Sequence, residues 1–180
     1  MNKLTVTVSH QQLPLKQVFR IARGAKTQAD VIVISICDGK NTGWAEAVPY
    51  ARYQESVEQV IGQVNTLSTP SLSTGDISEG ISTLPPGAAR NALDCAWWDL
   101  QAKQANCSVA QLLKLAPALP CTTAQTLSID TPDAMAKAVT KLNNPPLVKV
   151  KLDNQEIVAK MTAIAQAAPN SEFIVDANEG

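Results

Sequence analysis

Residues Leu147–Asp153 read LVKVKLD, and this stretch organises the interpretation of the whole chain. Its alternating apolar residues predict a strand, and a period of two places Lys149 and Lys151 on the same face. Alternating valine and lysine is also common on exposed edge strands, where the lysines face water. Taken alone, the stretch therefore leaves a solvated face and a functional site equally open.

A second predicted strand, Glu172–Asp176, favours the functional interpretation. Its apolar run ends with Asp176 and Asn178 at i and i+2, and one helical pattern separates it from the first strand. That order is typical of a βαβ unit in a parallel sheet. Parallel strands are usually covered on both faces, so polar side chains near their carboxyl ends tend to face a site. Paired lysines beside Asp176 therefore indicate a base and a metal ligand.

Length and composition are typical of a soluble globular protein. The chain has 180 residues, 45% hydrophobic and 17% charged, which suffices for one domain and part of another. A net charge of −1 gives no electrostatic reason to expect nucleic acid or membrane as a partner. No signal-peptide or membrane-spanning run is present, and the four cysteines lack CxxC spacing, which favours reduced thiols. These features predict a cytoplasmic location.

The first part of the chain predicts an α+β unit. The segment 14–28 has no clean period and is expected to be a loop, a kind of segment that often carries specificity. Pro85-Pro86-Gly87 opens a long helix whose broad apolar surface predicts that it is sandwiched between two layers. The expected strands and helices cover 3–9, 31–37, 42–48, 57–67, 85–105 and 108–115.

From Cys121 onward the pattern changes to alternating strands and helices. The strands begin about 25 residues apart, as expected of a (β/α) barrel or a doubly wound sheet. No GxGxxG or GxxxxGK[ST] motif follows a strand, so nucleotide binding loses its main support. The expected elements are strands at 122–129, 147–152 and 172–176 and helices at 131–143 and 154–168.

This set of residues suits removal of a proton next to a carboxylate. A lysine becomes a useful base only when desolvation or a neighbouring positive charge brings its pKa towards neutrality. Lys149 supplies such a charge beside Lys151, and Asp176 is a ligand that a hard cation such as Mg²⁺ prefers. A cation and a lysine base together suit proton abstraction α to a carboxylate, through an enolate. One carboxylate does not hold the metal alone.

Three motifs together resemble the enolase superfamily, in its muconate-lactonizing subgroup, and within it the L-Ala-D/L-Glu dipeptide epimerases. They are GAARNALDCAWWDLQAK at 87–103, TAQT at 123–126 and KVKLD at 149–153. The resemblance implies an α+β capping domain over residues 1–118, followed over 119–180 by the start of a (β/α)₇β TIM-like barrel, truncated after its third strand. It also implies epimerisation of dipeptides by 1,1-proton transfer through an Mg²⁺-stabilised enolate, in cell-wall peptide recycling.

The resemblance further implies a role for individual residues. Lys151 is the acid/base on one face of the substrate α-carbon, Lys149 tunes it, and Asp176 is the first of three ligands of one Mg²⁺ ion. Asn178 is expected to lie next to the metal ligands without contacting the ion itself. The dipeptide itself is expected to contact Arg23, Lys26, Tyr50, Tyr53 and Thr126.

The chain also departs from the family's pattern. Members of the family continue for well over a hundred further residues, which supply two more acidic metal ligands and a second lysine on the opposite face of the substrate. This chain has three of eight barrel strands, so it is expected to be an inactive fragment that arose by cloning, proteolysis or a frameshift. An open barrel exposes an apolar edge, which favours self-association, so a homo-oligomer is one expectation.

Two other interpretations stay open. One is a different enzyme of the same subgroup, such as an o-succinylbenzoate synthase, a cycloisomerase or an N-acylamino acid racemase, since these share the lysines and the metal. The other is a non-catalytic binding or assembly module, in which Lys149 and Asp176 form only a structural ion pair.

Overall fold

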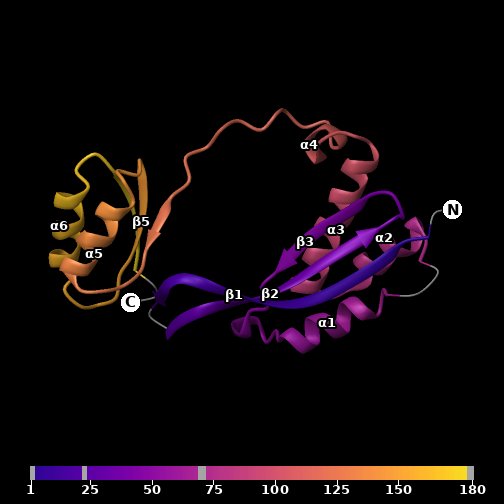
Figure 1. The fold of residues 1–180 in the computed structure, drawn as a ribbon, viewed down its shortest axis with the longest axis horizontal. Coiled ribbons are helices and arrows are strands. Elements are labelled where there is room, and N and C mark those ends of the chain that lie inside the picture. Colours follow the sequence, from indigo (N-terminus) through magenta and orange to yellow (C-terminus); the bar gives the residue numbers. More distant parts are fainter. Residues whose placement is uncertain (1–2, 22–23, 69–71, 178–180) are drawn as a thin grey trace. The chain divides into compact units, whose positions relative to one another are not determined.

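The computed structural model describes residues 3–21, 24–68 and 72–177 and divides the chain into two compact units (Figure 1). The first unit comprises Met1–Pro14 and Gln28–Ala118, and the second comprises Leu15–Thr27 and Leu119–Gly180. Within the described ranges each unit has a three-stranded sheet, ordered β1-β2-β3 and β4-β5-β6. None of the helices in these ranges has the length and apolar character needed to cross a membrane.

The first unit packs helices on one face of an antiparallel sheet. Strand β2 pairs with β3 from Ile32 opposite Ala47 to Cys37 opposite Thr42. Period-two alternation on β2 buries Ile32, Ile34 and Ile36 completely, and these residues form the core with the helices. The end of β1 and the start of β2 fall within Leu15–Thr27 and are grouped with the second unit. The elements of this part of the chain are β1 (Thr5–Ile21), β2 (Gly24–Cys37), β3 (Thr42–Ala47), η1 (Ala51–Tyr53), α1 (Val57–Asn65), α2 (Thr74–Thr83), α3 (Ala88–Gln104) and α4 (Val109–Leu112).

The predicted loop over 14–28 is wrong, because this segment extends the first two strands. β1 continues to Ile21, and β2 already begins at Gly24. Leu13 and Val18 are 42% and 44% exposed, and the described positions from Gly24 to Gln28 are exposed as well. A strand ribbon held by backbone hydrogen bonds has no core to impose an alternating pattern, so periodicity does not reveal it.

Helix α3 is the central helix of the first unit, and it buries one face only. The buried stripe consists of Ala89, Ala92, Leu93, Ala96, Leu100 and Ala102. Cys95 is exposed and Trp98 is half-buried, so the predicted sandwich between two layers is wrong. Small alanines on the buried stripe let the helix approach the sheet closely.

Strand β3 contacts α3 through backbone as well as side chains. The Trp44 N–H donates to Asp99 Oδ2 at 2.8 Å, and Lys103 Nζ donates to the same oxygen at 2.7 Å and to the Thr42 carbonyl at 2.8 Å. Partial burial raises the pKa of Asp99, but these hydrogen bonds outweigh it and hold the pKa below its usual value. Gly43 lies directly under the helix, since a Cβ there would be 2.1 Å from the Ala96 carbonyl oxygen.

Gly43→Ala is therefore expected to destabilise the first unit. The added methyl meets helix backbone, which cannot move aside locally, so we expect a loss of about 1–3 kcal/mol or more. Gly62→Ala is the matched control, because nothing lies within 4 Å of its Cβ position in α1. That change should raise stability by about 0.5–1 kcal/mol. Urea unfolding of the two variants measures both effects, and equal stabilities would contradict the close packing.

The turn between β2 and β3 is held by Asp38. Its Oδ1 accepts the N–H groups of Lys40 and Asn41 at 2.8 and 2.7 Å, and its Oδ2 accepts Gln104 Nε2 at 2.7 Å. The Asn41 N–H, the Gln104 amide and the Lys40 N–H together hold the pKa of Asp38 well below its usual value. The turn is thereby tied to the carboxyl end of α3.

Because the folded pKa of Asp38 is depressed, its contribution to stability is present above the unfolded pKa of about 3.9 and is lost as pH falls below it. The wild-type chain should lose more unfolding free energy between about pH 6 and pH 3 than Asp38→Asn does. Tryptophan fluorescence is a selective probe, because Trp44, Trp97 and Trp98, the chain's three tryptophans, all belong to the first unit. Identical pH profiles for the two proteins would contradict this role of Asp38.

The second unit is a parallel βαβαβ arrangement, as the sequence predicts. Leu127 lies opposite Val150 in the β4–β5 pair, and β5 pairs with β6 from Leu147 opposite Glu172 to Lys151 opposite Asp176. Both helices cover the same side of the sheet (Figure 1). The elements are β4 (Gln125–Leu127), α5 (Pro132–Lys141), β5 (Leu147–Lys151), α6 (Ile157–Ala167) and β6 (Glu172–Asp176).

The core of the second unit decides which strand face is left for chemistry. It consists of Leu127, Met135, Val139, Val148, Val150, Leu152, Ile164 and Ala168. Since Val148 and Val150 face the helices, alternation along β5 directs Lys149 and Lys151 to the opposite face. Helix α6 begins three residues later than the pattern predicts, because 154–156 form the turn that leads into it.

Candidate active site

Two lysine side chains of β5 converge on one carboxylate of β6. Lys149 Nζ and Lys151 Nζ each lie 3.0 Å from Asp176 Oδ2. The side chains are 38%, 15% and 29% exposed, respectively, so the group is partly shielded from solvent and Lys151 is its most enclosed member. The arrangement follows from the register, which sets Lys151 directly opposite Asp176, with Lys149 two residues earlier on the same face.

Strand β4 adds hydroxyl groups beside the lysines. Thr126 lies opposite Lys149 in the parallel pair and is half-buried. Ser128 follows two residues later, and its buried Oγ has no hydrogen-bond partner among the described residues. Buried hydroxyls without a partner are rare in native proteins. Ser128, which sequence reasoning missed, is therefore a further candidate for contact with a ligand.

The residues present do not make a complete metal site. No group of three histidine, cysteine, aspartate or glutamate side chains that could hold a metal ion occurs within the ranges that the structure describes. Asp176 suits a hard cation as one carboxylate ligand, and in this structure the two ammonium groups neutralise it. Mg²⁺ would need further ligands that these residues do not supply.

The other predicted site residues divide between the two units. Tyr50 and Tyr53 belong to the first unit, where their ring centroids are 6.0 Å apart and both side chains are exposed. Lys26 is an exposed residue near the start of β2 and is grouped with the second unit. Arg23 and Asn178 lie outside the described residues. The roles assigned to all of these side chains stay predictions.

Glu55 is a positioning residue that sequence reasoning missed. Its Oε1 accepts the Ala88 N–H at 2.6 Å, and its Oε2 accepts the Tyr50 N–H at 3.1 Å. Gly87, the residue at the start of α3, has no side chain to cap the helix, so Glu55 does so from 33 positions away. Glu55 thereby ties the turn bearing the two tyrosines to α3. No local pattern signals a contact over that separation.

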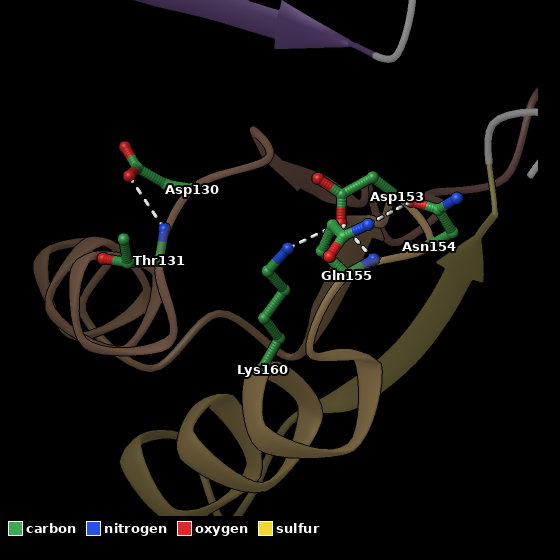
Figure 2. A network of polar contacts seen from close by, with 6 residues as sticks. All are labelled: Asp130, Thr131, Asp153, Asn154, Gln155 and Lys160. Carbon is green, nitrogen blue, oxygen red and sulfur yellow. Dashed lines mark hydrogen bonds and ion pairs between the residues drawn. The ribbon is translucent and has the colours of Figure 1, made fainter.

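A buried ion pair also lies beside the carboxyl end of β5 (Figure 2). Lys160 Nζ donates to Asp153 Oδ1 at 2.6 Å, and the Lys160 side chain is only 4% exposed. Lys160 stands four residues before the buried Ile164, whereas Ile157, an apolar residue of the same helix, is 47% exposed. The four-residue spacing to Ile164 therefore indicates that Lys160 lies on the buried face of α6, although the apolar residues taken alone indicate a different face.

The comparisons with known proteins identify the family. Residues 3–114 match the profile described as "Mandelate racemase / muconate lactonizing enzyme, N-terminal domain". The chain belongs to the mandelate racemase / muconate lactonizing enzyme family. The predicted fold, an enolase-superfamily α+β capping domain followed by the start of a barrel, is confirmed by this match and by the related structures.

Two curated relatives are isomerases that act on amino acid derivatives. The chain is 57% identical over 151 residues to the N-acetyl-D-glutamate racemase of a Pseudoalteromonas species, covering 83% of this chain and 48% of the relative. It is 43% identical over 178 residues to the L-Ala-D/L-Glu epimerase of Escherichia coli K12, covering 97% of this chain and 55% of the relative. The chain thus spans about half the length of the curated relatives it matches.

Solved structures support the same grouping. An enolase family member from Agrobacterium tumefaciens with homology to dipeptide epimerases, bound to sodium and L-Ala-L-Glu, superposes with a TM-score of 0.86 at 36% identity over 98% of this chain and 54% of that one. The dipeptide epimerase of Enterococcus faecalis, complexed with Mg and L-Leu-L-Tyr, gives a TM-score of 0.83 at 26% identity over 98% and 54%.

Asp176→Asn is expected to loosen the carboxyl end of β5. The change removes the anion between two ammonium groups and leaves their repulsion, so we expect the second unit to lose about 1 kcal/mol. Hydrogen exchange of the amides of Leu147–Lys151 should accelerate, and adding Lys149→Met should slow it again. Lys149→Met alone should have a smaller effect, since Lys149 is the more exposed lysine. Unchanged exchange in Asp176→Asn would contradict the pairing.

Proposed function

We propose that this chain forms part of an epimerase that moves the α-proton of an N-acylated glutamate, with L-Ala-D/L-Glu dipeptides as its substrates. The observation that supports the proposal is the convergence of Lys149 and Lys151 on the Asp176 carboxylate at the carboxyl end of parallel strands. Active sites of (β/α) barrels form at that end of the strands.

The proposed roles follow from burial and position. Lys151, the more enclosed lysine, removes or returns the α-proton on one face of the substrate, and Lys149 keeps a second positive charge beside it. Asp176 contributes one ligand of a Mg²⁺ ion, in line with the Mg-bound relative from Enterococcus faecalis. Such an ion, when bound, stabilises the negative charge of the enolate.

Both lysines lie on one strand, so they reach one face of the substrate α-carbon. Epimerisation also needs an acid on the opposite face, and the described residues do not place a second such group there. The chain by itself is therefore proposed to lack epimerase activity, and the whole protein's remaining ligands and second acid/base group would come from outside these residues.

N-acetyl-D-glutamate racemisation is the second candidate function. It is favoured by the 57% identity to the racemase of that name, which exceeds the identity to the dipeptide epimerase. Both named substrates are glutamates whose amino group is acylated, and they differ in the free ammonium group that the dipeptide carries. An anionic side chain facing that ammonium group would therefore separate the two activities.

Further details of the proposal follow from the dipeptide. With L-Ala-D/L-Glu as the substrate, the proposal includes a role in cell-wall peptide recycling in the cytoplasm. An o-succinylbenzoate synthase or cycloisomerase lacks support from the names of the relatives given above. A binding or assembly module would keep the Lys149–Asp176 pair as a purely structural contact, without exchange chemistry.

Solvent-deuterium incorporation tests the proposal. Residues 1–180 are joined to the remaining carboxyl-terminal part of the Escherichia coli relative, and the hybrid protein is incubated in D₂O with Mg²⁺ and either L-Ala-D-Glu or N-acetyl-D-glutamate. We expect deuterium at the α-carbon of the preferred substrate, and a loss of at least about a hundredfold in Lys151→Ala. Faster exchange with N-acetyl-D-glutamate would select the second candidate.

Lys103→Ala, a change in the first unit, is the control and should leave exchange nearly unchanged. Full exchange in the Lys151→Ala hybrid would refute the assigned role, and epimerisation by residues 1–180 alone would refute the need for further groups. Absence of exchange with both substrates would favour the binding or assembly module.

A further inference from the structure

We propose that Asp153 and Lys160 form a positioning pair that holds the end of β5, and hence Lys151, in register with Asp176. The proposal rests on the proposed function, in which Lys151 transfers the proton. It assigns a role to two residues that do not touch the site themselves.

The pair is built from a fully enclosed cation and a partly enclosed anion. Lys160 extends from α6 along the core, and its ammonium group meets Asp153 at 2.6 Å (Figure 2). The Gln155 N–H donates to the same carboxylate oxygen at 3.1 Å. The hydrogen bond from Lys160, joined by that of the Gln155 N–H, holds the pKa of Asp153 below its usual value against partial burial. The carboxylate is therefore charged and fixed from two directions.

In the described part of the chain, the start of α6 lacks the side-chain cap that four other helices have. Ser56, Ser73, Ser108 and Thr131 cap α1, α2, α4 and α5 with their side chains. At α6 no such cap is present among the described residues, and Glu156 takes a left-handed φ of 49°, which a residue with a Cβ rarely adopts. Asp153 and Lys160 thus hold together a turn that is otherwise weakly supported.

The turn connects directly to the proposed acid/base. Lys151 is two residues before Asp153, and the intervening Leu152 is buried, with its N–H donating to the Asp176 carbonyl at 2.9 Å. The end of β5 is therefore fixed on one side by β6 and on the other by Lys160. Displacing Asp153 would shift the backbone that sets the distance between Lys151 Nζ and Asp176.

Stability alone does not account for a charged pair here. Replacing a buried charge with an apolar side chain of similar size is often neutral or stabilising, because the charge loses its hydration on folding, and Lys160 is the enclosed member of this pair. A methionine at position 160 would fill the same space in the core. We therefore infer that the pair serves the geometry of the strand end.

Lysine acylation of the 180-residue chain tests the proposal without requiring activity. In Lys160→Met, the rate of Lys151 acetylation by acetic anhydride, measured by mass spectrometry, should rise about two- to fivefold as its pairing with Asp176 loosens. Lys103 in the first unit serves as an internal standard, and Val158→Ala, an exposed position of α6, is the control variant. An unchanged Lys151 rate in folded Lys160→Met would overturn the proposal.

Folding is monitored by circular dichroism. If Lys160→Met does not fold, the double variant Asp153→Asn/Lys160→Met removes both charges and gives the same readout. In the hybrid protein used for deuterium exchange, Lys160→Met should lower kcat about tenfold or more with KM nearly unchanged, because a misplaced base weakens the transition state and not the binding. A fall in kcat accompanied by an equally large rise in KM would contradict the positioning role of Lys160. Failure of the proposed function would appear separately, as no exchange in the unmodified hybrid.

Discussion

The parallel register of β5 and β6 is the constraint on which the candidate site depends. With Lys151 opposite Asp176, the two lysines and the acid lie next to one another on one face of the sheet. A shift of one residue would move Asp176 to the helix side of the sheet and the apolar Val175 to the lysines. Phe173 of β6 resists that shift, because it packs against the core of the unit and would be turned to the opposite face. The same packing that stabilises the unit therefore also selects the face that carries the chemistry.

The second unit contains two groups of ion pairs, which have different roles in the proposed function. Lys149 and Lys151 both pair with a carboxylate that, in the proposed function, also contributes to cation binding. A bound cation would compete with them for Asp176. Lys160 and Asp153, by contrast, pair with each other, and the Gln155 N–H also donates to Asp153. In the proposed function this second pair keeps its partners throughout.

The relatives restrict the chemistry more than the substrate. A racemase of N-acetylglutamate and an epimerase of L-Ala-D/L-Glu both invert a carbon that bears a proton, a carboxylate and an acylated nitrogen. In the proposed function, the lysines and Asp176 act on the part that these substrates share. The substrates differ at the far end of the acyl group. The comparisons therefore establish the family, and both substrates fall within the proposed reaction.

Local sequence patterns determined much of this protein. The alternation of LVKVKLD, the spacing of the strands, Thr131-Pro132 at a helix start and the motifs of the capping unit predicted the fold. They also predicted that Lys149, Lys151 and Asp176 lie on one face of the sheet. These features are encoded within about ten residues of each other or in a regular repeat, so periodicity reveals them. The extended β1–β2 ribbon escaped prediction because exposed strands have no core to impose a pattern. The Glu55 cap of α3 was decided only by tertiary packing, because Glu55 and Ala88 are 33 positions apart, and the sequence likewise does not show that the Ser128 hydroxyl is buried without a partner among the described residues. Lys160 is an intermediate case, because its partner Asp153 is near in the chain while its burial depends on how α6 packs.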